Sequence, residues 1–194
     1  MQKISLIVAS LLLFAGLASA QVPTSGNVFV GYSFENTSSS SLDFLNSNRA
    51  NLNGWEATLE GKVFPWVGIV ADFAGHYGTQ TEQFELGGIN STASVNAHEF
   101  TALFGPRVSV SVGKFRPFAE ALFGAGHITT SDTSGGVGLV SPSDTSFATA
   151  LGGGLDYKII RPVAVRFQGD YVQTRFFGNT QNDVRFSTGI VLRF

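Results

Sequence analysis

Histidine is the residue type here that most readily performs acid–base or metal chemistry, and it occurs three times, as His76, His98 and His127. If the segments that carry them form neighbouring strands, His76 and Glu99 come close together at the strand ends. A zinc site needs three or four protein ligands, and the sequence indicates no further ligand for this pair. The chain also has no cysteine, which excludes thiolate sites and disulfides. We therefore predict no metal and no cofactor.

A second candidate for chemistry is the triplet H-I-T at residues 127–129. It distantly resembles the His-x-Ser motif of outer-membrane lipid A deacylases, in which a histidine activates a serine. Threonine occupies the serine position here, and the resemblance ends with this triplet. The glycine run 152–154 lies inside a strand pattern, without the strand-to-helix turn of phosphate-binding loops. We predict no catalytic residue and do not expect an enzyme.

The charged residues form the most informative pattern, although they make up only 13% of the chain. Successive side chains of a strand point to opposite faces, and the charges fall opposite the main apolar row, except for Arg175 at a strand end. A lipid-facing Arg or Lys costs about 2–4 kcal/mol at the bilayer midplane. The pattern therefore favours lipid outside and a polar lumen inside. The predicted lumen charge network is Glu56, Glu60, Lys62, Asp72, Glu99, Arg107, Glu120, Asp156, Arg166, Asp170, Arg185 and Arg193.

Alternation of polar and apolar residues predicts eight strands, and their lengths suit tilted strands that cross a bilayer. The connections alternate between long polar loops, at 36–52, 79–97 and 128–146, and short turns. One strand is less regular than the others, because Phe118 and Leu122 share the face of Glu120. The expected strands are residues 27–35, 53–63, 67–78, 98–110, 117–127, 147–157, 163–176 and 184–194.

A barrel of eight strands has an interior just wide enough for side chains to fill. Acidic and basic residues from different strands must then pair, because unpaired buried charges are costly. The inward positions Gly31, Gly105, Ala150, Gly152 and Gly154 are expected to make room for long arginine side chains. We predict a plugged polar core and not an open pore.

Aromatic residues gather at the expected strand ends, as they do in the girdles at both interfaces of membrane barrels. The girdle at the short turns comprises Phe64, Trp66, Phe115, Tyr157 and Phe194, and the opposite girdle comprises Phe34, Trp55, Tyr77, Phe100, Phe147 and Phe176.

The N-terminus reads as a secretory signal peptide. Lys3 precedes an apolar stretch at residues 4–17, and Ala18-Ser19-Ala20 is a small-x-small cleavage site. The apolar stretch is short for a helical span, which needs about 20 residues. We predict cleavage near Ala20, with residues 1–20 as the signal peptide and residues 21–194 as one barrel domain.

The last eleven residues, V-R-F-S-T-G-I-V-L-R-F, alternate strictly. They resemble the closing strand of bacterial outer-membrane barrels, whose terminal Phe and alternate apolar residues are recognised by the barrel-assembly machinery. That resemblance assigns the assembly signal to Phe186, Ile190, Leu192 and Phe194. With G-P-R at 105–107 and A-L-G-G-G-L-D at 150–156, the chain resembles the small OmpA-type family. The resemblance implies an all-β, eight-stranded antiparallel up-and-down transmembrane barrel in the bacterial outer membrane.

For such a barrel we expect a structural or surface-interaction role. The expected partners are outer-membrane lipid and lipopolysaccharide, the assembly machinery, and a surface ligand at loops 36–52, 79–97 and 128–146. A net charge of −2 gives no electrostatic footprint for nucleic acid, and we expect a monomer. The alternatives are a narrow porin-like solute channel and a soluble lipocalin-like ligand binder, a fold that turns its apolar face inward.

Overall fold

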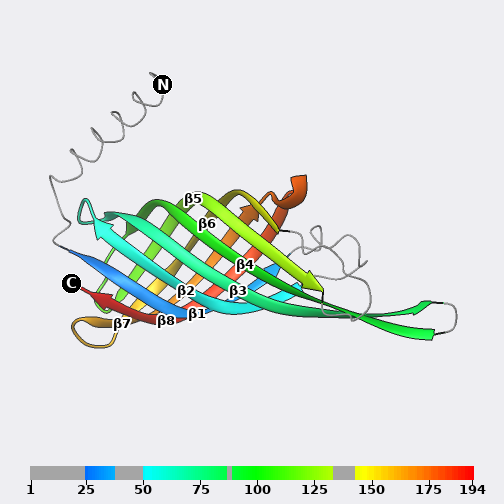
Figure 1. The fold of residues 1–194 in the computed structure, drawn as a ribbon. Helices are drawn as coiled ribbons and strands as arrows, with labels where there is room; N and C mark the ends of the chain where they lie inside the picture. The colour runs from blue at the N-terminus through cyan, green and yellow to red at the C-terminus, as the bar shows by residue number, and fades with distance from the viewer. Residues whose placement is uncertain (1–24, 38–49, 87–88, 133–142) are drawn as a thin grey trace, which may run out of the picture.

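Eight antiparallel strands close into a barrel in which each strand pairs with its neighbours in sequence and β8 pairs with β1 (Figure 1). This computed structural model describes residues 25–37, 50–86, 89–132 and 143–194, and the signal peptide predicted at residues 1–20 lies outside them. The predicted up-and-down topology is confirmed. The strands are β1 (Gly26–Thr37), β2 (Ala50–Lys62), β3 (Val67–Leu86), β4 (Ile89–Ser109), β5 (Phe115–Asp132), β6 (Ser143–Lys158), β7 (Val163–Thr174) and β8 (Gln181–Arg193), with a 3-10 turn, η3, at Phe176–Gly178.

The C-terminal strand seals the barrel through an unbroken ladder with β1, from Asn27↔Arg193 to Asn36↔Val184. Beyond that ladder, the Gly26 N–H donates to the Phe194 carbonyl at 3.0 Å, and the Phe194 N–H donates back to Gly26 at 3.1 Å. Closure leaves neither strand with an unpaired edge, which is the condition for a sheet to stand in lipid.

Short turns join β2 to β3, β4 to β5 and β6 to β7, and all three lie at the end of the barrel that carries the C-terminus (Figure 1). Each is closed by backbone hydrogen bonds, such as Val63 N–H to Val67 O at 3.0 Å and Ile159 N–H to Val163 O at 3.1 Å. In the described part of the chain, no helix is long and apolar enough to cross a membrane.

The prediction of a loop at residues 79–97 is wrong. There β3 and β4 continue as a paired ribbon, from Thr79↔Asn96 to Leu86↔Ile89, which projects beyond the barrel (Figure 1). Past the bilayer a strand meets water on both faces, so it needs no apolar row and its Thr, Ser, Asn and Gln residues resemble a loop. The other two loops are also shorter than predicted, because β1 ends at Thr37, β2 starts at Ala50, β5 ends at Asp132 and β6 starts at Ser143. Residues 38–49 and 133–142 lie outside the described residues.

The two faces of the barrel wall differ sharply in chemistry. Large apolar side chains cover the outside, for example Val30, Leu151 and Phe167 at 58%, 68% and 59% exposure. The charged side chains of the predicted lumen network point inward, opposite to the arrangement of a lipocalin-like binder. On the irregular strand β5, Phe118 and Leu122 lie inside together with Glu120.

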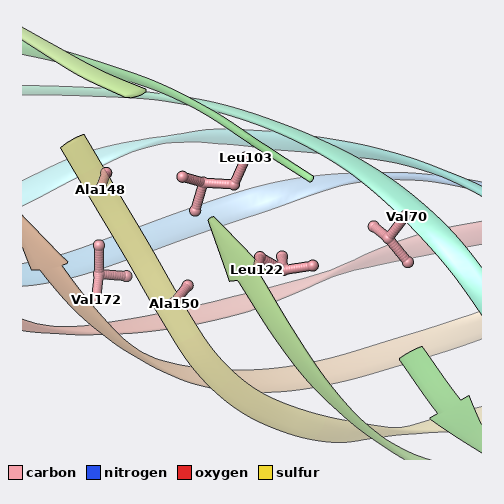
Figure 2. Packing of buried hydrophobic residues seen from close by; sticks show 6 residues of the cluster. All are labelled: Val70, Leu103, Leu122, Ala148, Ala150 and Val172. Carbon is pink, nitrogen blue, oxygen red and sulfur yellow. The ribbon is translucent and has the colours of Figure 1, made fainter. Parts of the chain in front are cut away.

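The interior also holds apolar side chains. Strands β3 to β7 contribute a cluster of buried aliphatic side chains, drawn in Figure 2. The same strands also carry buried charged side chains, so aliphatic and charged groups share the interior. The members of the aliphatic cluster are Val70, Leu103, Leu122, Ala148, Ala150 and Val172.

Replacing residues 81–94 of the ribbon with a short Gly–Ser linker should leave the barrel intact. The barrel ladders reach only Asn53↔Tyr77 on one side of the ribbon and Val95↔Asp132 on the other. Because an isolated two-stranded ribbon is itself marginal, its loss should change the free energy of unfolding by less than about 1 kcal/mol. Urea unfolding in detergent measures this, and failure of the shortened chain to fold would show that the barrel depends on the ribbon.

Candidate functional site: the charged lumen

The structure places all the predicted network residues on the inner face of the wall. Ten are buried, and Lys62 and Arg193, near the short-turn end, retain side-chain exposures of 12% and 25%. The period-2 alternation of the strands puts them there, since every second residue faces the lumen.

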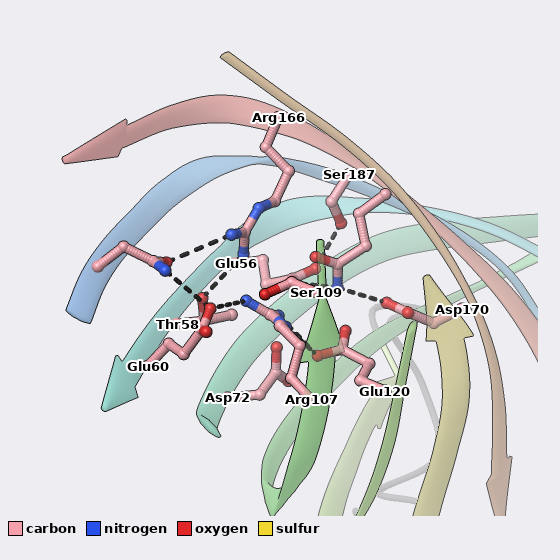
Figure 3. A network of polar contacts seen from close by, with 12 residues as sticks. Glu56, Thr58, Glu60, Asp72, Arg107, Ser109, Glu120, Arg166, Asp170 and Ser187 are labelled. Atoms are coloured by element: carbon pink, nitrogen blue, oxygen red, sulfur yellow. Dashed lines mark hydrogen bonds and ion pairs between the residues drawn. The ribbon is translucent and has the colours of Figure 1, made fainter. Parts of the chain in front are cut away.

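Arg185 is the centre of one group of ion pairs. From β8 its guanidinium reaches Asp72 Oδ1 on β3 at 3.1 Å, Asp170 Oδ2 on β7 at 3.0 Å and Glu56 Oε2 on β2 at 3.5 Å. All four side chains are at most 3% exposed. Ser187 donates a further hydrogen bond to Glu56 (Figure 3). A single cation therefore ties four strands together across the lumen.

Glu60 is the centre of a second group, nearer the short turns. Its carboxylate is 3.3 Å from Arg107 Nη1, 2.9 Å from Arg116 Nη2 and 2.8 Å from Lys62 Nζ. Arg107 also donates through Nε to Glu120 at 2.7 Å (Figure 3). Sequence reasoning missed Arg116 by assigning it to a turn. In fact β5 begins at Phe115, and Arg116 has the same parity as the inward Glu120.

Asp156 organises a third group. It accepts a hydrogen bond from Arg166 Nε at 2.7 Å and pairs with Arg193 Nη2 at 3.2 Å. The Phe118 ring lies beneath two arginines, with Arg107 Cζ at 4.4 Å and Arg166 Cζ at 4.6 Å from its centroid. Buried cation–π contacts of this kind can be worth about 2 kcal/mol. The sequence indicated that Phe118 shares a strand face with Glu120, but nothing in it indicated that the ring would contact arginines.

The inward glycines make room for other groups than arginine. A Cβ on Gly154 would lie 2.7 Å from Phe118 Cζ, and one on Gly152 would overlap the Asp170 carboxylate. A Cβ on Gly31 would lie 2.6 Å from Phe29 Cζ, and Gly105 closely faces the backbone of β5. The predicted role of these glycines is therefore wrong in detail, because they accommodate phenylalanine rings, a carboxylate and neighbouring backbone.

The end of the lumen opposite the short turns holds His76 and Glu35. His76 Nδ1 lies 3.2 Å from Glu35 Oε2, and its Nε2 lies 2.8 Å from Ser33 Oγ. Glu99 is directly opposite His76 in the β3–β4 register and is 2% exposed. Among the described residues, no group of three His, Asp or Glu side chains is arranged to hold a metal ion.

His127 and Thr129 of the triplet at residues 127–129 lie elsewhere, on the outer face, and Ile128 between them is buried. Thr129 Oγ1 is 3.2 Å from His127 Nε2, and His127 Nδ1 is 2.7 Å from Thr145 Oγ1. The imidazole is thus oriented by a hydroxyl, whereas the triads of hydrolases use a carboxylate for this purpose.

The predicted assembly signal follows the outward face of β8. Phe186, Ile190, Leu192 and Phe194 are 47–62% exposed.

Phe176, predicted for the outer girdle, is instead completely buried beneath the β7–β8 connection, where a Cβ on Gly126 would lie 2.9 Å from its ring. The 3-10 turn η3 directs this ring inward, which a strand pattern could not reveal.

Phe118→Leu should destabilise the barrel by about 1–3 kcal/mol, because the substitution removes two cation–π contacts and some packing volume. Phe123→Leu is the matched control, since it lies on the same strand but on the outside, at 50% exposure. Urea unfolding in lipid vesicles compares the two. Equal losses of unfolding free energy in the two variants would show that the contacts between Phe118 and the arginines do not stabilise the barrel.

The comparisons with known proteins agree with this geometry. The solved Neisserial surface protein A (NspA) is 10% identical, with a TM-score of 0.63, over 87% of this chain and 97% of that chain. Ail, the attachment invasion locus protein of Yersinia pestis, is 16% identical, with a TM-score of 0.60, over 89% of this chain and 100% of that one. These likenesses show the fold. No curated protein sequence matches the chain.

Sequence comparison at the level of families is decisive. Residues 6–194 match the family described as "Outer membrane protein beta-barrel domain". The chain therefore belongs to this family of outer-membrane β-barrel proteins.

Proposed function

We propose that this protein is a closed structural barrel of the bacterial outer membrane that also presents a surface for interaction outside the cell. The observation that carries the proposal is the cross-lumen pairing of Arg185 with Glu56, Asp72 and Asp170. These side chains come from four strands and occupy the space that a solute would need. The family and the fold support the outer-membrane location.

Two further features support a closed lumen. The Glu60 and Asp156 groups place paired side chains in the half of the barrel near the short turns, and the aliphatic cluster adds buried side chains from β3 to β7. Charges locked in buried pairs are expensive to separate, so opening a path for solutes would require several pairs to break together.

The surface role rests on the ribbon formed by residues 79–86 and 89–96. In the ribbon, β3 and β4 stay paired with each other beyond the point where the other strands of the barrel end, away from the short-turn end (Figure 1). We propose that the ribbon, together with segments 36–52 and 128–146, contacts a ligand outside the cell, while lipid and lipopolysaccharide cover the apolar wall. The protein acts as a monomer and performs no catalysis.

Maturation and assembly complete the proposal. Cleavage near Ala20 releases the exported chain, and the barrel-assembly machinery recognises Phe186, Ile190, Leu192 and Phe194. Support comes from the exposure of these four side chains along β8, the strand that closes the barrel.

Conductance in planar lipid bilayers tests the closed lumen. The mature chain should give no discrete current steps, because the arginine groups leave no continuous aqueous path. Arg185→Ala should not conduct either if the aliphatic cluster also blocks the lumen. Regular openings of the unmodified protein would contradict the proposal and would favour a narrow porin-like channel.

A further inference from the structure

Three cationic side chains gather on two neighbouring short turns. Lys114 lies in the β4–β5 turn, Lys158 is the last residue of β6, and Arg161 lies in the β6–β7 turn. The Lys158 N–H donates to the Lys114 carbonyl at 2.8 Å, which joins the two turns. Lys114 and Arg161 are exposed, and Lys158 is half-buried. We call these three residues the basic rim.

No acidic side chain neutralises the basic rim. The carboxylates in this half of the barrel are Glu60, Glu120 and Asp156, and all three are buried in the lumen and paired with arginines there. Among the described residues, no ion pair involves any of the three rim cations. The Arg193 N–H donates to the Pro162 carbonyl at 2.9 Å, so the carboxylate of Phe194 lies beside this turn. The three rim cations outnumber it and give a net positive charge at the end that faces the periplasm in this family.

Large apolar side chains lie directly beside these cations. Ile159 and Ile160 separate Lys158 from Arg161 and are 53% and 61% exposed, and Val112 in the adjacent turn is 63% exposed. Isoleucines at the tip of a turn are unfavourable in water but favourable in acyl chains. A cation and an apolar side chain side by side match the phosphate and the adjoining acyl region of a phospholipid.

We propose that the basic rim binds the phosphate groups of anionic phospholipids in the inner leaflet of the outer membrane. The argument is charge complementarity at the depth where the headgroups lie, reinforced by the exposed isoleucines. An acidic periplasmic polymer would also meet the positive charge, but it would gain nothing from Ile159 and Ile160.

Quenching of a single tryptophan by brominated lipid tests the proposal. Tyr157→Trp, in a Trp55→Phe and Trp66→Phe background, places the reporter next to Lys158. The protein is refolded in vesicles of equimolar phosphatidylcholine and phosphatidylglycerol, with bromine on one lipid or the other. We expect phosphatidylglycerol to be enriched about threefold at the reporter, because each cation near the surface attracts anionic lipid.

The combined Lys114→Gln, Lys158→Gln and Arg161→Gln variant should abolish the enrichment. The matched control is Arg175→Gln, an exposed cation at the opposite end with no ion pair among the described residues, and it should leave the enrichment unchanged. Equal quenching by both lipids in the unmodified rim would overturn the proposal. Loss of the enrichment on adding inorganic phosphate or soluble polyglutamate, at constant ionic strength, would overturn it too, because it would assign the rim to free phosphate or to an acidic polymer.

Discussion

Arg185→Met should lower the free energy of unfolding by about 3–5 kcal/mol, the loss typical of breaking a buried ion pair from one side. The substitution leaves Glu56, Asp72 and Asp170 in the lumen without the cation that they share. Methionine roughly preserves the length of the side chain. The loss of unfolding free energy is therefore due more to the missing charge than to a change in packing volume. Urea unfolding in vesicles, followed by the fluorescence of Trp55 and Trp66, gives the difference directly.

Two companion variants make this result interpretable. Arg175→Met removes an exposed cation and should change stability by less than about 0.5 kcal/mol. Adding Asp72→Asn and Asp170→Asn to Arg185→Met should recover part of the loss, because fewer uncompensated charges remain. An effect at Arg185 no larger than that at Arg175 would contradict the role given to the central arginine.

Leu151→Arg should destabilise the barrel by about 2–4 kcal/mol in a bilayer, as expected for a cation at the lipid-facing midplane. Leu151 is 68% exposed on β6, between Phe147 and Tyr157 near the two strand ends. In a water-soluble protein, replacing so exposed a side chain would change stability little. The size of the effect therefore distinguishes lipid from water outside the barrel.

Ile160→Arg serves as the depth control for this substitution. Ile160 is 61% exposed but lies in the β6–β7 turn, where a charge should cost about 0–1 kcal/mol. Unfolding by urea in vesicles of one lipid composition compares the two variants. Similar small losses at both positions would argue that the outer face of β6 does not contact lipid.

The assignment of side chains to the two faces was predictable because it depends only on parity. Glu60 and Arg107 share neither a strand nor a neighbourhood in the sequence, yet both were placed inside by alternation with apolar residues such as Leu59 and Val108. The cost of a charge in lipid enforces this alternation at nearly every transmembrane position.

The partners within the lumen were not predictable. Arg185 and Asp72 are 113 residues apart in the chain, and their contact depends on the stagger of the strands around the barrel. The position of Phe118 beneath two arginines depends on the same stagger, together with the absence of a side chain at Gly154. No pattern within a single strand carries that information.

The strand ends were the least predictable part of the fold. Alternation identifies a strand only where one face meets lipid and the other meets the lumen, and this difference vanishes beyond Tyr77 and His98. The ribbon at residues 79–86 and 89–96 therefore resembled a loop although its backbone is paired. Arg116 was missed for a related reason, since it is the second residue of β5.

Heat-modifiability on a denaturing gel tests the central claim, a closed barrel with lipid outside and a filled lumen, most directly. The mature chain is refolded in detergent, treated with protease and run unheated and boiled. A compact, protease-resistant band that shifts on boiling is the result we predict, because the closed ladder and the buried ion pairs resist the detergent until they are heated. A chain that stays monomeric and soluble without detergent and shows no shift would contradict the account.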